Sequence, residues 1–257
     1  MRTLRRVGIG LALHLKQESR NPFFLWIVIC TPLIYATMAY FLFRRGTDDA
    51  TLVTAAVGSA LMGIWSLTTT AGAATLGHHR RLGILELLVA APAPFWQAIV
   101  PITIATAGIG IYSLVTGLVY VRVLFGVPVA VHDWPAFLVS VPPTIVSMGM
   151  LGFLFCAAFV RFRHSWAVGN LFEFPVWTIT GLLIPLAVLP TWVEPLAWVA
   201  APTWGMNALR ASALGGSSAW DDIAMCVLLS VVYAVLGMML MRVFLQSARR
   251  AGTLALS

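Results

Sequence analysis

The chain has 257 residues, of which 60% are apolar and only 10% charged, against about 25% charged residues in an ordinary soluble domain. Sixteen basic residues, fifteen of them Arg, and nine acidic residues give a net charge of +7. One or two soluble domains could not hide so much apolar surface from water, which excludes a cytosolic enzyme and a disordered chain. The composition therefore predicts a polytopic membrane protein.

The N-terminal stretch predicts a basic amphipathic helix over residues 1–21 that lies on the cytoplasmic surface of the membrane. Its apolar residues recur at helical spacing, and the stripe consists of Leu4, Val7, Leu11 and Leu15. Asn21 and Pro22 then indicate a break, because Asn suits an N-cap and Pro suits the first turn of a new helix.

Six apolar runs follow, each near the 20 residues that a membrane-crossing helix needs. The expected spans are 24–43, 50–77, 98–121, 136–160, 174–193 and 223–241. The third span is placed late because the apolar run 87–121 is too long for one crossing and Pro92 and Pro94 interrupt it. Residues 22–245 are thus expected to form a six-helix transmembrane domain, and residues 246–257 a cytoplasmic tail.

The basic residues predict the orientation of these spans. With the N-terminus inside the cell, most Lys and Arg residues flank the cytoplasmic ends of the spans, whereas most acidic residues fall outside. Both termini are therefore expected in the cytoplasm. The excess of Arg is then explained by topology and by membrane lipid, and nucleic acid is not expected as a partner.

The spans lack the residues that most membrane chemistry requires. The spans 50–77, 98–121, 136–160 and 223–241 contain no Asp, Glu, Lys, Arg or His, which argues against an ion-coupled carrier. No His-Glu-x-x-His zinc signature is present, and the single lysine, Lys16, does not belong to a phosphate-binding Gly-Lys-Ser/Thr motif. We expect no catalytic residue, metal site or cofactor on this chain.

The connection between spans two and three predicts a short cytoplasmic helix. Leu82, Leu85 and Val89 share one face at helical spacing, and Pro92 ends the pattern. Two to three turns are too short to cross a membrane but suit a helix that lies along its surface.

The segment after span five predicts a broken, short helical structure on the outer side. Pro185, Pro190 and Pro195 forbid one continuous helix. Val193 and Leu196 then favour a short amphipathic helix against the outer leaflet. The same segment carries further landmarks, which are Gly181, the run Leu-Pro-Thr-Trp at 189–192, the run Pro-Thr-Trp at 202–204, and Arg210.

Together these two segments resemble the permease subunits of type-2 ATP-binding-cassette exporters, the family that includes daunorubicin-resistance membrane subunits. Residues 83–88 read Gly-Ile-Leu-Glu-Leu-Leu and are followed by Ala-Ala-Pro, close to the family's loop between spans two and three. Ile84 departs from the usual Thr, and His78, His79 and Arg80 stand where the family commonly has Glu.

The resemblance implies a coupling helix that docks on a separate ATP-binding subunit. Its residues here are Arg80, Arg81, Leu82, Gly83, Ile84, Leu85 and Glu86. It further implies two ATP-binding subunits that carry ATP and Mg²⁺, and a second permease, identical or paralogous, in a bacterial plasma membrane. The expected activity is multidrug or antibiotic efflux, that is, export of an amphipathic drug, antibiotic or lipid-like substrate.

In this architecture spans two and five line the substrate path. The candidate path residues are Ser59, Met62, Trp65, Ser66, Thr69, Asn170, Glu173, Trp177, Thr178 and Thr180. A candidate outer gate consists of Leu182, Leu183 and Ile184. For each, ordinary helix packing is the alternative, because small and hydroxyl residues let helices approach closely in lipid.

Glu173 has two possible positions. If span five ends at Pro185, its start near Ser165 places Glu173 inside the membrane, on one face with Asn170 and Trp177. If the span begins at Phe174, Glu173 lies at the cytoplasmic surface. An intramembrane carboxylate would also allow an ion-coupled carrier, and a membrane scaffold without transport is a further alternative. The cargo and the choice between homodimer and heterodimer stay open.

Overall fold

A computed structural model describes residues 2–44, 49–81, 96–128, 131–159, 169–184, 186–215 and 218–251. Every regular element in these ranges is a helix, which confirms the predicted all-helical class. The predicted coupling segment from Leu82 to Pro92 lies outside the described residues, and so do residues 160–168, where one placement of the fifth span begins.

Within the described ranges, five segments are long and apolar enough to cross a membrane. They are α2 (Pro22–Phe43), α3 (Asp49–Arg81), the pair α5 (Trp96–Ile109) and α6 (Ile111–Phe125), α7 (Trp134–Phe159) and α12 (Ala219–Ala251). These segments coincide with the predicted spans one to four and six, and the chain is therefore a multi-pass membrane protein.

The predicted break before the first span is confirmed. Asn21 is the N-cap of α2, and its side-chain oxygen accepts a hydrogen bond of 3.3 Å from the backbone N–H of Phe24. Pro22 occupies the first turn, where its missing N–H leaves no partner unsatisfied.

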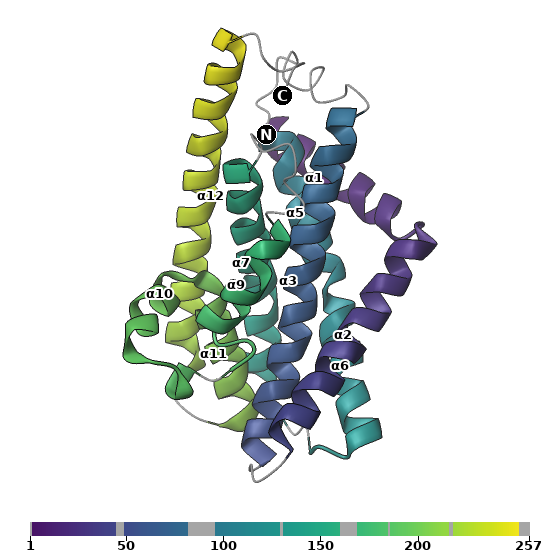
Figure 1. Cartoon of the computed structure of the whole chain (residues 1–257), viewed down its shortest axis with the longest axis vertical. Helices are drawn as coiled ribbons and strands as arrows, with labels where there is room; N and C mark the ends of the chain where they lie inside the picture. The colour runs from purple at the N-terminus through teal and green to yellow at the C-terminus, as the bar shows by residue number, and fades with distance from the viewer. Residues whose placement is uncertain are drawn as a thin grey trace.

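Helix α3 is the centre of the bundle (Figure 1). It contacts α2, α5, α6, α7 and α11, and residues 53–69 are all buried. The helices α2 and α12 are instead peripheral and expose apolar side chains such as Ile34 and Leu228. Exposed apolar side chains on peripheral helices are typical of a membrane protein, since lipid tails are as apolar an environment as the interior of the protein.

The third span is divided into two helices at Gly110, a feature that the apolar pattern did not predict. Gly110 separates α5 from α6, although its N–H still bonds to the Thr106 carbonyl and its own carbonyl accepts from Leu114. A Cβ at Gly110 would lie 2.7 Å from the Ile64 side chain of α3. Glycine thus allows the third span to pack directly against the central helix.

The prediction of a crossing helix over residues 174–193 is wrong. Helix α9 (Glu173–Ile179) has seven residues and ends in a left-handed Gly181 with φ of +75°. The N–H of Leu182 bonds to the Trp177 carbonyl, and that of Gly181 to the Thr178 carbonyl, which is the Schellman pattern of a terminated helix. The helix therefore ends before the first proline that was expected to stop it.

Four short elements follow α9. They are the 3₁₀ turns η1 (Leu186–Val188) and η2 (Thr191–Val193) and the helices α10 (Glu194–Val199) and α11 (Ala201–Leu214). Helix α10 occupies the predicted position of the short amphipathic helix. Helix α11 was not predicted, and it packs between α7 and α12 with most of its residues buried. The segment thus returns into the bundle instead of staying on its surface.

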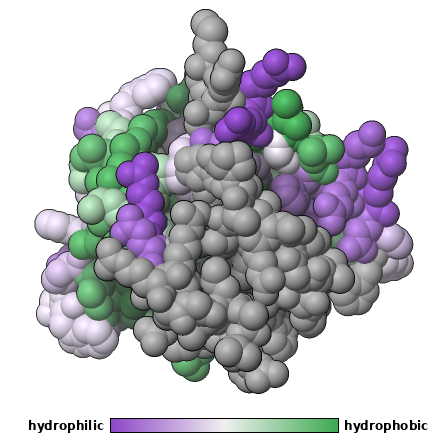
Figure 2. Space-filling view, turned by 90° about the horizontal axis from the view of Figure 1, so that it is seen from above, coloured by the Kyte–Doolittle hydropathy of each residue, from purple (hydrophilic) through white to green (hydrophobic). Residues whose placement is uncertain are grey.

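The first helix and the last helix place both ends of the described chain at one end of the bundle (Figure 1). Helix α1 (Arg2–Glu18) lies against α5, where a Cβ at Gly10 would be 3.0 Å from the Pro101 ring. In the view from above, Figure 2 shows hydrophilic residues next to hydrophobic residues on the sides of the bundle. The exposed arginines of α1 and α12 include Arg5, Arg6 and Arg242. Which membrane face this end occupies stays a prediction.

Candidate functional site

A hydrogen-bonded group of polar side chains joins three helices in the bundle. The Ser66 hydroxyl of α3 donates to the carboxylate of Glu173, the first residue of α9. The Tyr35 hydroxyl of α2 lies 3.1 Å from Ser66 Oγ. Because Ser66 gives its only proton to the carboxylate, Tyr35 is the donor to Ser66. We call these three residues the Glu173 junction.

Contacts between aromatic rings of α2 and α9 stabilise the Glu173 junction. The rings of Tyr35 and Trp177 meet edge to face with centroids 5.0 Å apart, and Trp177 meets Phe174 in the same way at 5.0 Å. Edge-to-face pairs stabilise packing beyond simple burial. Trp177 is one helical turn from Glu173 on α9, so the ring contact and the hydrogen bonds fix α9 against α2 and α3 together.

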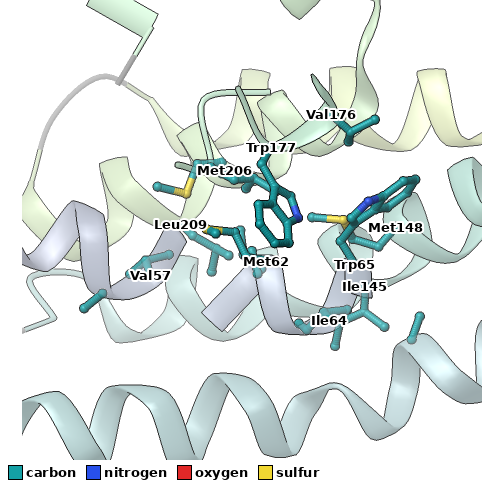
Figure 3. Packing of buried hydrophobic residues seen from close by; sticks show 14 of the residues in the cluster. Val57, Met62, Ile64, Trp65, Ile145, Met148, Val176, Trp177, Met206 and Leu209 are labelled. Carbon is teal, nitrogen blue, oxygen red and sulfur yellow. The ribbon is translucent and has the colours of Figure 1, made fainter. Parts of the chain in front are cut away.

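The junction borders a core rich in methionine and tryptophan (Figure 3). Trp65 and Trp177 are 0% and 2% exposed and pack in one cluster with Met62, Met148 and Met206. The indole nitrogens of both tryptophans have no hydrogen-bond partner among the described residues. Native proteins rarely leave buried donors unpaired, so each such donor requires an explanation.

The candidate path residues of α3 lie inside the chain's own core. Ser59, Met62, Trp65, Ser66 and Thr69 are all buried between α3 and its neighbours. The Ser59 hydroxyl donates to the Ala56 carbonyl, and the Thr69 hydroxyl to the Trp65 carbonyl. In this conformation these two hydroxyls form hydrogen bonds within α3. The hydroxyl of Ser66 instead forms hydrogen bonds with side chains of other elements.

The candidate path residues of the fifth segment divide into two groups. Glu173 and Trp177 belong to the packed junction. The hydroxyls of Thr178 and Thr180 donate to carbonyls one turn earlier in α9. Asn170 is partly buried, and the described residues form no hydrogen bond with its side chain. The structure thus unites Glu173 and Trp177, as their helical spacing predicted, and adds Ser66 from α3.

The candidate gate residues lie directly after α9. Leu182 is 2% exposed, and a Cβ at Gly58 of α3 would overlap its carbonyl oxygen. Leu183 is partly buried and lines a small pocket with Thr51, Thr54 and other residues of the α2–α3 end. Ile184 is also partly buried. A gating role for the three residues stays a prediction.

The candidate docking residues begin on α3 itself. This helix continues without a break to Arg81, four residues beyond the expected span two. Arg80 and Arg81 form the last residues of α3, whereas Leu82, Gly83, Ile84, Leu85 and Glu86 lie outside the described residues. The central helix therefore leads directly into the predicted docking segment.

Sequence reasoning missed Tyr35 and Gly58. Tyr35 carries a hydroxyl in the middle of an apolar span, a position where a hydrogen-bond partner is required, and this signal could have identified it. Gly58 gave no such signal, since the presence of a glycine in an apolar helix has many possible explanations.

A comparison with protein-family models matches residues 8–214 to the ABC-2 type transporter family. A comparison with curated proteins finds no match. The matched range includes four of the long apolar segments, the Glu173 junction and the returning helix α11. Proteins of this family are transport components in the membrane, and ATP hydrolysis takes place on partner subunits. The match spans well over half of the chain, and this protein therefore belongs to the ABC-2 type transporter family, as the permease component of an ABC transporter.

Proposed function

We propose that this chain exports an amphipathic drug, antibiotic or lipid-like substrate from a bacterial cell, driven by ATP on separate subunits. Two ATP-binding subunits, with ATP and Mg²⁺, would act from the cytoplasmic side on two permeases, identical or paralogous. The observation that carries the proposal is the family match over residues 8–214, to which the structure adds a continuous helical connection.

That connection is helix α3. It runs unbroken for 33 residues, about 50 Å, from the connection after α2 to Arg81. One end leads into the predicted docking segment, and the middle carries Ser66 of the Glu173 junction. A displacement of the docking segment on ATP binding would therefore move α3 against α2 and α9. Such helix shifts between two packed arrangements are an established way to convert ligand binding into domain motion.

The path residues proposed for substrate contact are those of α3 and of the α9 region. The burial of the α3 residues, and of Trp177 and Thr180 on the fifth segment, supports a closed arrangement from which a movement of α3 and α9 would expose them. Leu182, Leu183 and Ile184 are proposed as an outer gate, because they follow the terminated helix α9 and adjoin Gly58. The hydroxyl and thioether groups of this lining favour weakly polar, amphipathic cargo.

An ion-coupled carrier is the second candidate, and the position of Glu173 favours it. The carboxylate bonds to Ser66 of one spanning helix and is linked through Ser66 to Tyr35 of another, and such a carboxylate is the kind of group that binds a coupling proton or ion. The two candidates differ in their energy source. A carrier would continue to transport after ATP is depleted, provided that an ion gradient persists.

Everted membrane vesicles from cells that express the chain with its partners test the proposal. We expect uptake of fluorescent amphipathic drugs that requires ATP, is inhibited by orthovanadate and survives a protonophore. Glu86→Ala should reduce this uptake because Glu86 belongs to the predicted docking segment, whereas Glu194→Ala, at an exposed site on α10, should not. Uptake that persists without ATP and collapses with the proton gradient would refute the ATP-driven mechanism and favour the carrier.

A further inference from the structure

Aromatic side chains surround Glu173 both in sequence and in space. Its two neighbours in the chain are Phe172 and Phe174, and its hydrogen-bond partner Ser66 follows Trp65. Ring contacts link the aromatic residues of four different elements. The six residues are Tyr35, Trp65, Phe155, Phe172, Phe174 and Trp177.

The rings form two connected series, one beginning on each side of Glu173. On one side, Phe174 contacts Trp177, which contacts Tyr35, each with centroids 5.0 Å apart. On the other side, Phe172 contacts Phe155 of α7, and Phe155 contacts Trp65 of α3, each at 5.6 Å. The carboxylate is thus attached to a scaffold of electron-rich rings on α2, α3, α7 and α9.

The charge of Glu173 is not balanced within the described part of the chain. No described Lys, Arg or His side chain forms an ion pair with it, and the donor that contacts its carboxylate from α3 is the neutral hydroxyl of Ser66. An ionised carboxylate offers about four acceptor positions, so it retains capacity for a further donor. Glu173 is partly buried, and a charge that is partly withdrawn from water is costly unless a partner compensates it.

The indole N–H of Trp177 is a second unsatisfied group at the same place. It is buried, it lacks a partner among the described residues, and its ring contacts Tyr35 and Phe174. The structure therefore brings together an acceptor with an uncompensated charge, aromatic rings, and a buried donor. Phe174 is 64% exposed, so this group of residues adjoins the surface of the chain.

This chemistry suits an organic cation better than a metal ion. One carboxylate with two hydroxyls does not supply the six or more oxygen ligands that Ca²⁺ takes. In the described part of the chain, no group of three His, Cys, Asp or Glu side chains could hold a metal. A weakly hydrated ammonium or phosphonium group instead gains from both the carboxylate and the faces of aromatic rings.

We propose that Glu173 and the six aromatic residues form a binding site, within a single chain, for a monovalent organic cation with apolar substituents. The carboxylate binds the charge, the rings contact its apolar substituents, and the Trp177 N–H donates to an acceptor on the same molecule. Ser66 and Tyr35 are positioning residues that hold the carboxylate. This inference rests on the proposed transport function, since the bound cation is the cargo.

Binding of tetraphenylphosphonium to the full chain in lipid nanodiscs tests the site, with empty nanodiscs subtracted. Tetraphenylborate is the matched probe, because it has nearly the same size and shape but the opposite charge. The wild-type chain should bind the cation at least about tenfold more tightly than the anion. Glu173→Gln should weaken cation binding about tenfold or more and remove the preference for the cation.

Three further variants separate this site from a structural role of the same residues. Glu173→Asp keeps the charge and should keep the preference for the cation. Trp177→Phe should weaken binding about two- to tenfold. Glu194→Gln removes an exposed carboxylate and should change nothing. Thermal unfolding of each variant establishes that the chain is folded.

Three results would overturn the site: no tetraphenylphosphonium binding by the wild type, equal binding of both probes, or unchanged binding by Glu173→Gln. This assay needs neither ATP nor a partner subunit. Loss of the site therefore leaves the ATP-driven mechanism to be judged by the vesicle experiment. Conversely, cation binding without ATP-dependent uptake would retain the site and reject that mechanism.

Discussion

Gly58 determines how closely the segment after α9 approaches the central helix. A side chain at this position would overlap the carbonyl oxygen of Leu182, which is backbone and cannot rotate away. The same segment carries Gly181, whose positive φ ends α9. Two glycines on different elements therefore determine where the chain turns back into the bundle, one by conformation and one by the space that it leaves.

Gly58→Ala should destabilise the protein, because the Leu182 segment must move away from α3 to accommodate the new Cβ. Overpacking of this kind costs about 1–3 kcal/mol, which should appear as a lower Tm of the purified chain in detergent. Gly108→Ala is the matched control, because Gly108 is also helical and a Cβ at this position of α5 would meet no atom within 4 Å. Its Tm should be unchanged or higher, since Ala stabilises helices by up to about 1 kcal/mol. Equal effects of the two substitutions would contradict the proposed close contact.

At the scale of elements, the break between α10 and α11 is stabilised by a side chain from α12. The Tyr233 hydroxyl donates to the Val199 carbonyl and accepts from the N–H of Ala201, at 3.2 Å. Ala201 is fully buried, so without this hydroxyl its N–H would face an apolar interior. Tyr233 thereby joins the returning segment to the last long helix.

Tyr233→Phe should lower stability by about 1–3 kcal/mol, because it leaves a buried backbone donor without a partner. Urea or thermal unfolding of the purified chain measures the loss. Tyr112→Phe, on the exposed face of α6, should have little effect. If Tyr233→Phe is as stable as the wild type, the hydroxyl does not stabilise the break.

The start of α2 is the second element boundary that a single side chain stabilises. Asn21→Ala removes the acceptor for the Phe24 N–H and should cost about 1 kcal/mol, whereas Asn21→Ser should retain most of the stability. Comparing the Tm values of the two variants tests the cap. An equal loss in both would mean that Asn21 acts in another way.

For the whole molecule, the arrangement of α1 and α12 makes the membrane topology testable. Ser19 directly follows α1, Gln246 lies near the end of α12, and Ser218 directly precedes α12; all three are exposed. With the three native cysteines replaced by Ala, a membrane-impermeant maleimide applied to intact cells should label Ser218→Cys. It should label Ser19→Cys and Gln246→Cys only after the membrane is opened. The reverse pattern would contradict the predicted cytoplasmic position of both termini.

Much of the fold could be predicted, because the length of an apolar run directly reflects the thickness of a membrane. Five such runs match long segments of the structure, and the Asn21–Pro22 break matches a cap that depends on local hydrogen bonds. The fifth apolar run gave a wrong prediction because its length also matches the thickness of a membrane. Residues 174–193 are as apolar as a spanning helix, although Gly181 ends α9 and the chain then turns back. The close approach of Gly110 to Ile64 involves another helix, and no local pattern reveals it.

The candidate site was predicted only in part. Ser66, Glu173 and Trp177 were all singled out from the sequence, but Ser66 on span two was not connected with Glu173 and Trp177 on span five. The contact between Ser66 and Glu173 joins residues 107 positions apart, and Tyr35 joins through Ser66. Such contacts follow from how helices pack, which sequence periodicity does not specify. The docking segment around Gly83 and Glu86 stays a prediction from the family resemblance.

Purification from native membranes in mild detergent, followed by mass spectrometry and an ATPase assay, tests the central claim most directly. If the chain is an ATP-driven permease, it should purify with an ABC ATP-binding subunit and a second permease, and the complex should hydrolyse ATP. Altering Gly83 or Glu86 should remove the ATP-binding subunit. A chain that purifies alone, without nucleotide-dependent activity, would contradict the account.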